Sequence, residues 1–250
     1  MIEWTQKEGR HMGRAYEVRK LSIQKNGMAK TKIYTNYAKE IYLAAKRGVP
    51  EIESNTILKR LVEKAKKEQV PNDIIKRAVD KAKGNSGEEY EAITYEGFGP
   101  GASTLIVKTL TDNVNRTVGM VRAAFTKVHK SLGVNNSVSY NYDYLAIISI
   151  KSEKEEEIFN ALLEEGIEPV DFESVDGEII ITLKPTDHNK AKDVLEKLIP
   201  NVEYELDEEG MYAKDKVTLE GEELETFNLL LKLLNDIDDV TEIYHNVNLD

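Results

Sequence analysis

The chain has 250 residues, of which 40% are hydrophobic and 32% charged, and its formal net charge at pH 7 is −11. No apolar run approaches the roughly 18 residues that a membrane-spanning helix needs, and the N-terminal segment lacks the apolar core of a secretory signal. The absence of cysteine excludes disulfides and thiolate metal sites and suits a reducing compartment. We therefore expect a globular protein of the cytoplasm that does not enter a membrane.

The net charge conceals an uneven distribution along the chain. Residues 1–83 contain 20 lysines and arginines against 10 acidic residues, whereas residues 142–207 contain 6 against 18 and residues 208–250 contain 3 against 12. A basic segment in an otherwise acidic chain indicates a polyanionic partner for that segment. The acidic remainder is ordinary for a well-dissolved protein and indicates no particular partner.

Three amphipathic helices are predicted in the basic part of the chain. Apolar residues recur at helical spacing in 31–48, 54–69 and 70–84, and Gly48 and Gly84 end the first and the third helix. Each helix is too short to be stable alone, so we expect the three to share one small core. Residues 1–83 are therefore predicted to be a basic arm followed by a three-helix domain.

From residue 84 the apolar period changes to that of strands. Residues 91–97 and 103–110 are predicted strands around a glycine-rich turn, and residues 113–132 are a predicted helix. Residues 142–207 then follow the order β-α-β-β-α-β, which is the ferredoxin-like order. The turn signal Asp176-Gly177 separates the second and third strands of that unit.

The last segment, residues 208–250, is predicted to be strand, helix and strand, which is half of such a unit. The strand-strand-helix segment before residue 142 is also incomplete alone. We expect these halves to form one discontinuous domain, residues 84–141 with 208–250, with residues 142–207 inserted in it as an acidic ferredoxin-like domain. The predicted fold class is α+β multidomain: an N-terminal three-helix bundle and two ferredoxin-like α/β domains, one inserted in the other.

The glycine-rich turn, YEGFGPGAS at residues 95–103, has the spacing of a relaxed dinucleotide fingerprint. That fingerprint requires a helix after the turn, and the strand predicted there excludes it. Two interpretations stay open: a hairpin loop whose glycines supply positive φ, or a loop that contacts a nucleic acid or ribosomal surface with an aromatic ring stacked on a base. The contacts expected in the second case are Gly97, Phe98, Gly99 and Gly101.

Residues 111–117, TDNVNRT, join the second of these strands to the helix. One polar residue among Asp112, Asn113 and Asn115 is expected to cap the helix. Arg116 is unfavourable for the helix dipole in the first turn, which leaves binding of a partner as one reason for its presence. These four residues are the second group of candidate loop contacts.

No catalytic constellation is recognised. The four histidines show no metal-ligand spacing, and no serine lies in a nucleophile motif. The acidic clusters at 153–157, 207–209 and 236–239 are expected to be solvated faces and helix caps rather than general-acid pairs or a magnesium site. We therefore expect no enzyme activity, no metal and no cofactor.

Lysines and arginines form stripes along the three basic helices. They are either ordinary solvent-facing side chains or, beside the basic arm, a broad phosphate-binding surface. The expected nucleic-acid contacts are Arg14, Arg19, Lys20, Lys25, Lys30, Lys32, Lys39, Lys46, Arg47, Arg60, Lys64, Lys67 and Arg77.

Seven stretches of the chain resemble the YebC family, the bacterial probable transcriptional regulators related to mitochondrial translational activators. They are MGRAYEVRK at 12–20, KEIYLAAKRG at 39–48, VPNDIIKRAVDKAKG at 70–84, YEGFGPGAS at 95–103, LTDNVNRTVGMVRAAFTK at 110–127, NNSVSYNYD at 135–143 and DDVTEIYHN at 238–246. The chain departs from the family pattern at Ala102, where a glycine is expected, and in its N-terminal start.

The resemblance implies a three-helix N-terminal domain and two α/β domains, in agreement with the prediction from the residues. It also implies a cytosolic, nucleic-acid-associated regulator, transcriptional in much of the family and, in other members, a ribosomal factor that relieves stalls at proline-rich stretches. We expect a monomeric translation factor that binds the ribosome through ribosomal RNA or tRNA. The alternatives are a DNA-binding transcriptional regulator, for which no helix-turn-helix is recognised, and an uncharacterised enzyme.

Overall fold

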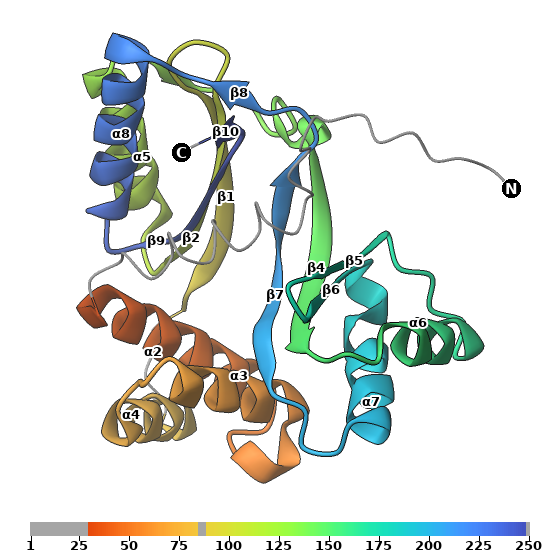
Figure 1. Cartoon of the computed structure of the whole chain (residues 1–250). Helices are drawn as coiled ribbons and strands as arrows, with labels where there is room; N and C mark the ends of the chain where they lie inside the picture. Colours follow the sequence, from red (N-terminus) through yellow and green to blue (C-terminus); the bar gives the residue numbers. More distant parts are fainter. Residues whose placement is uncertain (1–29, 85–88, 249–250) are drawn as a thin grey trace, which may run out of the picture. The chain divides into compact units, whose positions relative to one another are not determined.

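The computed structural model describes residues 30–84 and 89–248, which form an α+β fold with N-terminal helices and two four-stranded sheets (Figure 1). These residues divide into two compact units. One comprises residues 144–211, and the other comprises the preceding described residues up to 143 together with 212–248. No helix in these ranges has the length and apolar character needed to cross a membrane.

The basic helices share one core, as predicted. Their bounds are α2 Lys30–Arg47, the short 3-10 turn η1 Ile52–Ser54, α3 Thr56–Lys67 and α4 Asn72–Lys83. The helices bury one apolar stripe each, which includes Ile41 of α2, Leu58 of α3 and Ile75 of α4. Asn55 fixes the α2–α3 corner, because its Oδ1 accepts from the Leu58 amide that opens α3 while its Nδ2 donates to carbonyls at the end of α2.

The next elements belong to the same unit and form its sheet. They are β1 Glu91–Phe98, β2 Thr104–Thr111, α5 Val114–Lys127, β3 Ser131–Leu132, the turn η2 Ser139–Asn141, β8 Val217–Thr218, α8 Gly221–Asn235, β9 Val240–His245 and β10 Val247–Asn248. The strand order is β3-β1-β2-β9, and β2 pairs with β9 in antiparallel register although residues 144–211 lie between them in the chain. Helices α5 and α8 pack on this sheet around Phe125 and Phe227.

Two elements of this unit differ from their predicted form. The helix predicted to reach residue 132 ends at Lys127, because His129 adopts a positive φ of 56° and the Lys130 amide turns back to the Phe125 carbonyl. The strand predicted to open the last segment is only the two residues of β8, which pair in parallel with β10 outside the four-stranded sheet. The last segment therefore contributes β9 alone to that sheet.

Residues 144–211 carry the β-α-β-β-α-β order that the sequence predicts. The elements, including the strand ends that extend beyond this unit, are β4 Tyr142–Lys151, α6 Glu155–Glu164, β5 Asp171–Val175, β6 Glu178–Leu183, the turn η3 Pro185–Asp187, α7 His188–Leu198 and β7 Tyr204–Ala213. The sheet order β5-β6-β4-β7 is the ferredoxin-like order. Positive φ at both Asp176 (54°) and Gly177 (80°) closes the β5–β6 hairpin, as the Asp-Gly signal predicts.

The three hydrophobic cores are built from different segments of the chain. One uses the basic helices, one uses residues 105–128 with 217–247, and one uses residues 146–204. This distribution supports the division that we propose: residues 1–83, residues 84–141 with 208–250, and the inserted residues 142–207. We refer to these as the helical domain, the middle domain and the inserted domain.

Candidate nucleic-acid interface

Most of the basic residues predicted as phosphate contacts in the helical domain lie on the side of their helix that faces away from its core. In α3, the apolar positions Leu58, Val62 and Ala65 are buried, so helical periodicity leaves Arg60 and Lys64 exposed. The exposed basic side chains of this domain that the sequence predicts as phosphate contacts are Lys30, Lys46, Arg47, Arg60, Lys64, Lys67 and Arg77. Arg14, Arg19, Lys20 and Lys25 lie outside the described residues.

Several of these cations already have a partner within the protein. Arg77 pairs with Asp73 one turn earlier, and the Lys46 Nζ lies 5.5 Å from the centroid of the Tyr42 ring. Arg47 and Lys64 make no ion pair with any described residue, although both are exposed. Unpaired exposed cations are the groups most available to neutralise phosphates.

Lys39 and Lys32 have a different environment from the other predicted contacts. The Lys39 side chain is only 13% exposed, and its Nζ lies 3.0 Å from Asp239 Oδ1 and donates to the Leu110 and Asp238 carbonyl oxygens. Lys32 donates to the carbonyl of Asn235 at the end of α8, and burial lowers its pKa to about 8. Both lysines therefore tie α2 to the middle domain, and we remove them from the proposed phosphate contacts.

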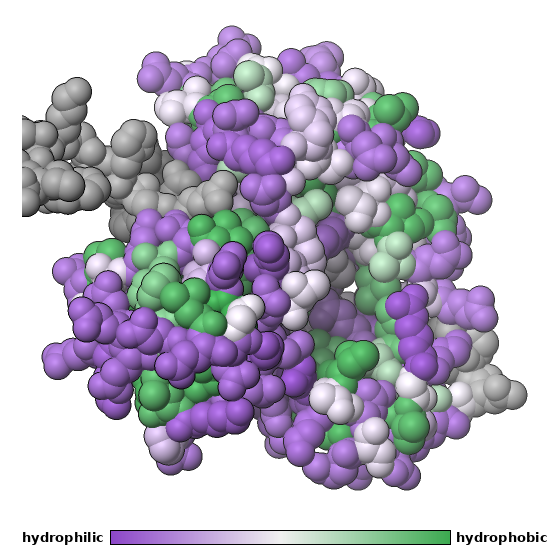
Figure 2. Space-filling view, turned by 90° about the vertical axis from the view of Figure 1, so that its right-hand side faces the viewer, coloured by the Kyte–Doolittle hydropathy of each residue, from purple (hydrophilic) through white to green (hydrophobic). Residues whose placement is uncertain are grey.

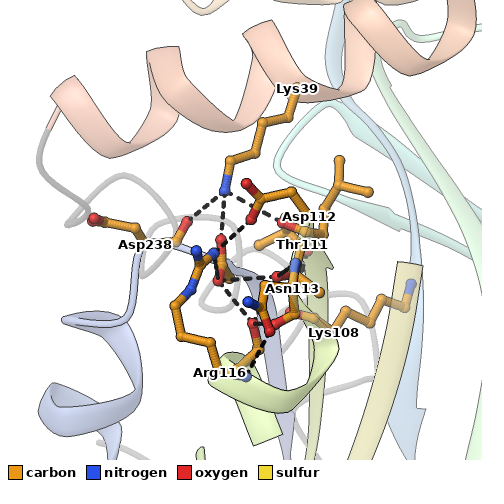
Figure 3. A network of polar contacts seen from close by, with 11 residues as sticks. Lys39, Lys108, Thr111, Asp112, Asn113, Arg116 and Asp238 are labelled. Atoms are coloured by element: carbon orange, nitrogen blue, oxygen red, sulfur yellow. Dashed lines mark hydrogen bonds and ion pairs between the residues drawn. The ribbon is translucent and has the colours of Figure 1, made fainter. Parts of the chain in front are cut away.

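Asp239 is the centre of this polar network. Figure 3 shows the side chains of Lys39, Asp112 and Arg116 pointing toward one another in the network. The Asp239 carboxylate is only 5% exposed, and its Oδ1 accepts a hydrogen bond from Lys39. Its Oδ2 accepts from Arg116 (2.8 Å), Thr117 (2.8 Å) and Thr111 (3.1 Å). Burial alone would raise the pKa of this carboxyl, but the hydrogen bonds from Arg116, Thr117 and Lys39 outweigh it and lower the pKa to about 2. The acidic cluster at 236–239 is thus wrongly predicted as wholly solvated, because Asp239 is buried and paired.

The TDNVNRT loop supplies the other half of the network. Asn113 is the helix cap, since its Oδ1 accepts from the Arg116 amide at 3.0 Å. The Arg116 guanidinium, 46% exposed, bridges Asp112 at 2.7 Å and Asp239. An intramolecular partner therefore accounts for the arginine in the first helical turn, while Asp112, Asn113 and Asn115 remain exposed.

The glycine-rich turn is a β-hairpin, and close packing explains its glycines. A Cβ at Gly97 would lie 2.5 Å from the Phe125 ring of α5, and one at Gly99 would lie 2.4 Å from Ser103 Oγ. Gly101 has a positive φ of 57° and faces Glu223 of α8. The ladder runs through Gly97↔Leu105 and Phe98↔Thr104, so a strand follows the turn and no helix is present to hold a dinucleotide.

Phe98 ends β1 with its side chain 44% exposed. It lies on the sheet face opposite Gly97, the same face as Glu96, and its ring is close to Gly133. The buried Glu96 carboxylate accepts from the Asn136, Val138 and Ser139 amides at 2.7–3.0 Å and so holds the loop beside Phe98. This role of Glu96 has no local sequence signal, because the partner amides lie some 40 residues further along the chain.

The remaining titratable clusters give no catalytic arrangement in the described residues. No group of three or more histidine, aspartate or glutamate side chains there could hold a metal ion. His188 is held between Asp207 Oδ1 (2.7 Å) and Glu209 Oε1 (2.9 Å), so the cluster at 207–209 is partly buried and not solely a solvated face. This cluster ties α7 to β7 within the inserted domain.

Comparison with known proteins identifies the relatives of the chain. Residues 14–85 match the TACO1/YebC protein N-terminal domain, and residues 90–247 match the TACO1/YebC second and third domain. A "Probable transcriptional regulatory protein" of Marinobacter nauticus is 43% identical over 95% of this chain and 99% of its own length. Another protein with this name, from Acholeplasma laidlawii, is 44% identical over 94% of this chain and 98% of its own length.

A solved structure has the same fold. The crystal structure of a conserved hypothetical protein from Aquifex aeolicus is similar with a TM-score of 0.70 and 32% identity, covering 87% of this chain and 90% of that chain. The family matches extend over the helices, both sheets and the loops that surround the Asp239 network. The chain therefore belongs to the TACO1/YebC family.

Proposed function

We propose that this protein is a nucleic-acid-binding regulator of gene expression that acts in translation, on ribosomal RNA or tRNA, and relieves stalled ribosomes. The observation that carries the proposal is the exposed basic surface of the helical domain, in which Arg47 and Lys64 have no ion pair among the described residues. Phosphate neutralisation by such cations supplies most of the affinity in sequence-independent binding. We assign no enzymatic activity, since its relatives are named regulators.

In this proposal the middle domain supplies the second contact. The hairpin tip presents Phe98, a partly exposed ring suited to stacking on an unpaired base, and the adjacent surface carries Asp112, Asn113 and Asn115. The Lys39–Asp239 ion pair keeps the middle domain attached to the basic helices. The basic residues of the helical domain and the loops of the middle domain would then bind the same nucleic acid. In this proposal the protein works as a monomer in the cytoplasm.

A DNA-binding transcriptional regulator is the second candidate, since relatives of the chain are named probable transcriptional regulatory proteins. Against it, the three basic helices show no recognition helix with base-reading side chains. In-cell cross-linking with sequencing separates the two. We expect cross-links to ribosomal RNA or tRNA, and cross-links confined to promoter DNA would refute the translational role.

The basic surface is tested by the salt dependence of binding to a ribosomal RNA fragment. The double variant Arg47→Gln/Lys64→Gln removes two proposed phosphate contacts, so the slope of log K against log salt should fall by about 1.4 to 1.8. The same arithmetic predicts a loss of affinity of about 15- to 30-fold at 0.15 M salt and almost none at 1 M.

The matched control is Lys184→Gln/Lys197→Gln, which removes the same charge from exposed positions of the inserted domain. It should leave the slope unchanged. Equal losses in the two double variants would mean that net charge, and not the basic surface, governs binding. A reporter with a proline-rich stretch then tests the cellular role: cells that lack the protein should show more ribosome stalling there, and the Arg47→Gln/Lys64→Gln variant should restore translation only partly.

A further inference from the structure

The inserted domain exposes a strip of apolar side chains along one side of α6 and β5. Phe159 and Leu163 project from α6 with exposures of 37% and 41%, and Val170, just before β5, is 43% exposed. The Phe159 ring meets the Phe172 ring of β5 edge to face, with centroids 5.1 Å apart. We call these four residues the apolar strip. Figure 2 shows hydrophobic residues gathered in patches on an otherwise hydrophilic surface.

The strip is made of two pairs of side chains that meet at one ring contact. Phe159 and Leu163 are one helical turn apart on α6, and Val170 and Phe172 are two residues apart and so point to the same face of the extended chain. The edge-to-face contact of Phe159 with Phe172 joins the two pairs.

The core of the inserted domain does not need the exposed part of this strip. Ile158 and Leu162, on the neighbouring positions of α6, are fully buried and fill the interior. A helix that buries its core stripe and still exposes a phenylalanine and a leucine beside Phe172 presents an interaction surface.

Acidic residues dominate the charge around the strip. Between Glu155 and Leu183, which includes α6, β5 and β6, the chain has ten acidic residues and no lysine, arginine or histidine. Lysines that contact this segment include Lys154, which pairs with Glu157, and Lys190, which donates to the Glu165 carbonyl. At β5, burial and the neighbouring Asp171 both raise the pKa of Glu173, so like charges lie close together on this strand. Such a surface repels nucleic acid and attracts a cationic partner.

The strand beside the strip also has an open edge. β5 is the outer strand of its sheet and pairs only with β6 among the strands that the structure describes. Its second backbone edge is therefore available to a segment that lies along it.

We propose that the apolar strip is a docking surface for a basic protein segment that also carries apolar side chains. Apolar contacts with Phe159 and Leu163 would supply the anchor, and the surrounding carboxylates would select for lysine and arginine on the partner. The strip shares no residue with the proposed phosphate contacts, so the proposal does not depend on nucleic-acid binding.

The test uses the full-length protein and two synthetic peptides of about 18 residues, one of leucine and lysine that forms an amphipathic helix and one of serine and lysine with equal charge. NMR titration should show the leucine peptide perturbing amides of α6 and β5, and it should bind about tenfold or more tightly than the serine peptide. Phe159→Ser and Leu163→Ser should each weaken the leucine peptide about tenfold, whereas Leu229→Ser, at an equally exposed position of α8, should have no effect.

Glu156→Gln/Glu164→Gln provides a second variant that leaves the apolar residues intact, and it should reduce both the affinity and its salt dependence. A photo-cross-linking amino acid at position 163 should capture, in cells, a protein segment rich in lysine or arginine, and one at position 229 should not. Equal binding of the two peptides, perturbations outside α6 and β5, or cross-links only to RNA or to a second copy of this chain would each overturn the proposal.

Discussion

Replacing Asp239 by asparagine should destabilise the unit that contains the helical and middle domains. Asparagine resembles the protonated carboxyl, so its cost follows from the preference of the site for the ionised form. The Asp239 pKa of about 2, compared with 3.8 for an ordinary aspartate, corresponds to roughly 2 to 3 kcal/mol at neutral pH. The loss is large because the substitution leaves Lys39, which is only 13% exposed, without its ion pair.

The difference in stability between the wild type and Asp239→Asn should depend on pH. A carboxyl whose pKa is lower in the folded state stabilises the protein above about pH 4, and this contribution disappears as the pH falls to about 2. The difference between wild type and Asp239→Asn should therefore be full at pH 7 and close to zero near pH 2. Hydrogen exchange of the amides of β2 and α5, or urea unfolding followed by NMR at those amides, measures the difference.

Asp112→Asn is the matched control, because it makes the same charge change on the other partner of Arg116. Asp112 is 44% exposed, so we expect its replacement to cost less than about 1 kcal/mol. Equal effects of the two substitutions, or a difference for Asp239→Asn that persists at pH 2, would refute the assignment of Asp239 as the ionised centre of the network.

Three further predictions concern other residues. Gly97→Ala should cost about 1 to 3 kcal/mol, since the new Cβ would meet the Phe125 ring, and Phe125→Leu should recover part of the loss; a Tm equal to that of the wild type would contradict this packing. Phe98→Ala should preserve the NMR spectrum of the fold but weaken binding to single-stranded RNA by about tenfold, and unchanged RNA affinity would confine the ring to a structural role. The pKa values of His188 and His245 should be shifted in opposite directions from that of an ordinary histidine, and an NMR pH series measures both. Burial opposes protonation of His188, but the carboxylates at both ring nitrogens raise its pKa, so its stabilisation is complete below about pH 6.5 and is lost as the pH rises through the raised value. Burial lowers the pKa of His245 to about 4, so stability is lost there as the pH falls from about 6.5 to 4; a shared pKa near 6.5 would contradict both environments.

The types of most elements and the fold class could be predicted from the sequence because their signals are local. The apolar periods of the three basic helices and of the β-α-β-β-α-β segment are properties of neighbouring residues, and the Asp176-Gly177 signal specifies a hairpin by its backbone preferences alone. The hairpin at the glycine-rich turn was predictable for the same reason, since the strand after it is β-branched and not helical.

Side-chain partners far apart in the chain could not be predicted in this way. Lys39 belongs to a regular lysine stripe, and only the contact with Asp239, 200 residues later, distinguishes it from the exposed Lys46. Two other contacts also depend on which segments meet after folding. They are the hydrogen bonds that Glu96 accepts from amides of a distant loop, and the packing of Gly97 against the Phe125 ring.

The helices, the α+β class and the basic character of the N-terminal part follow from periodicity, turn chemistry and charge, which are properties of short stretches of residues. Which cations remain exposed for a phosphate, and which are paired inside the protein like Lys39, depends on the tertiary structure. The tertiary structure also places Phe159 of α6 against Phe172 of β5 in a predominantly acidic part of the chain. The physical reason is the same in both cases: burial and pairing depend on the approach of distant segments, which a local pattern does not contain.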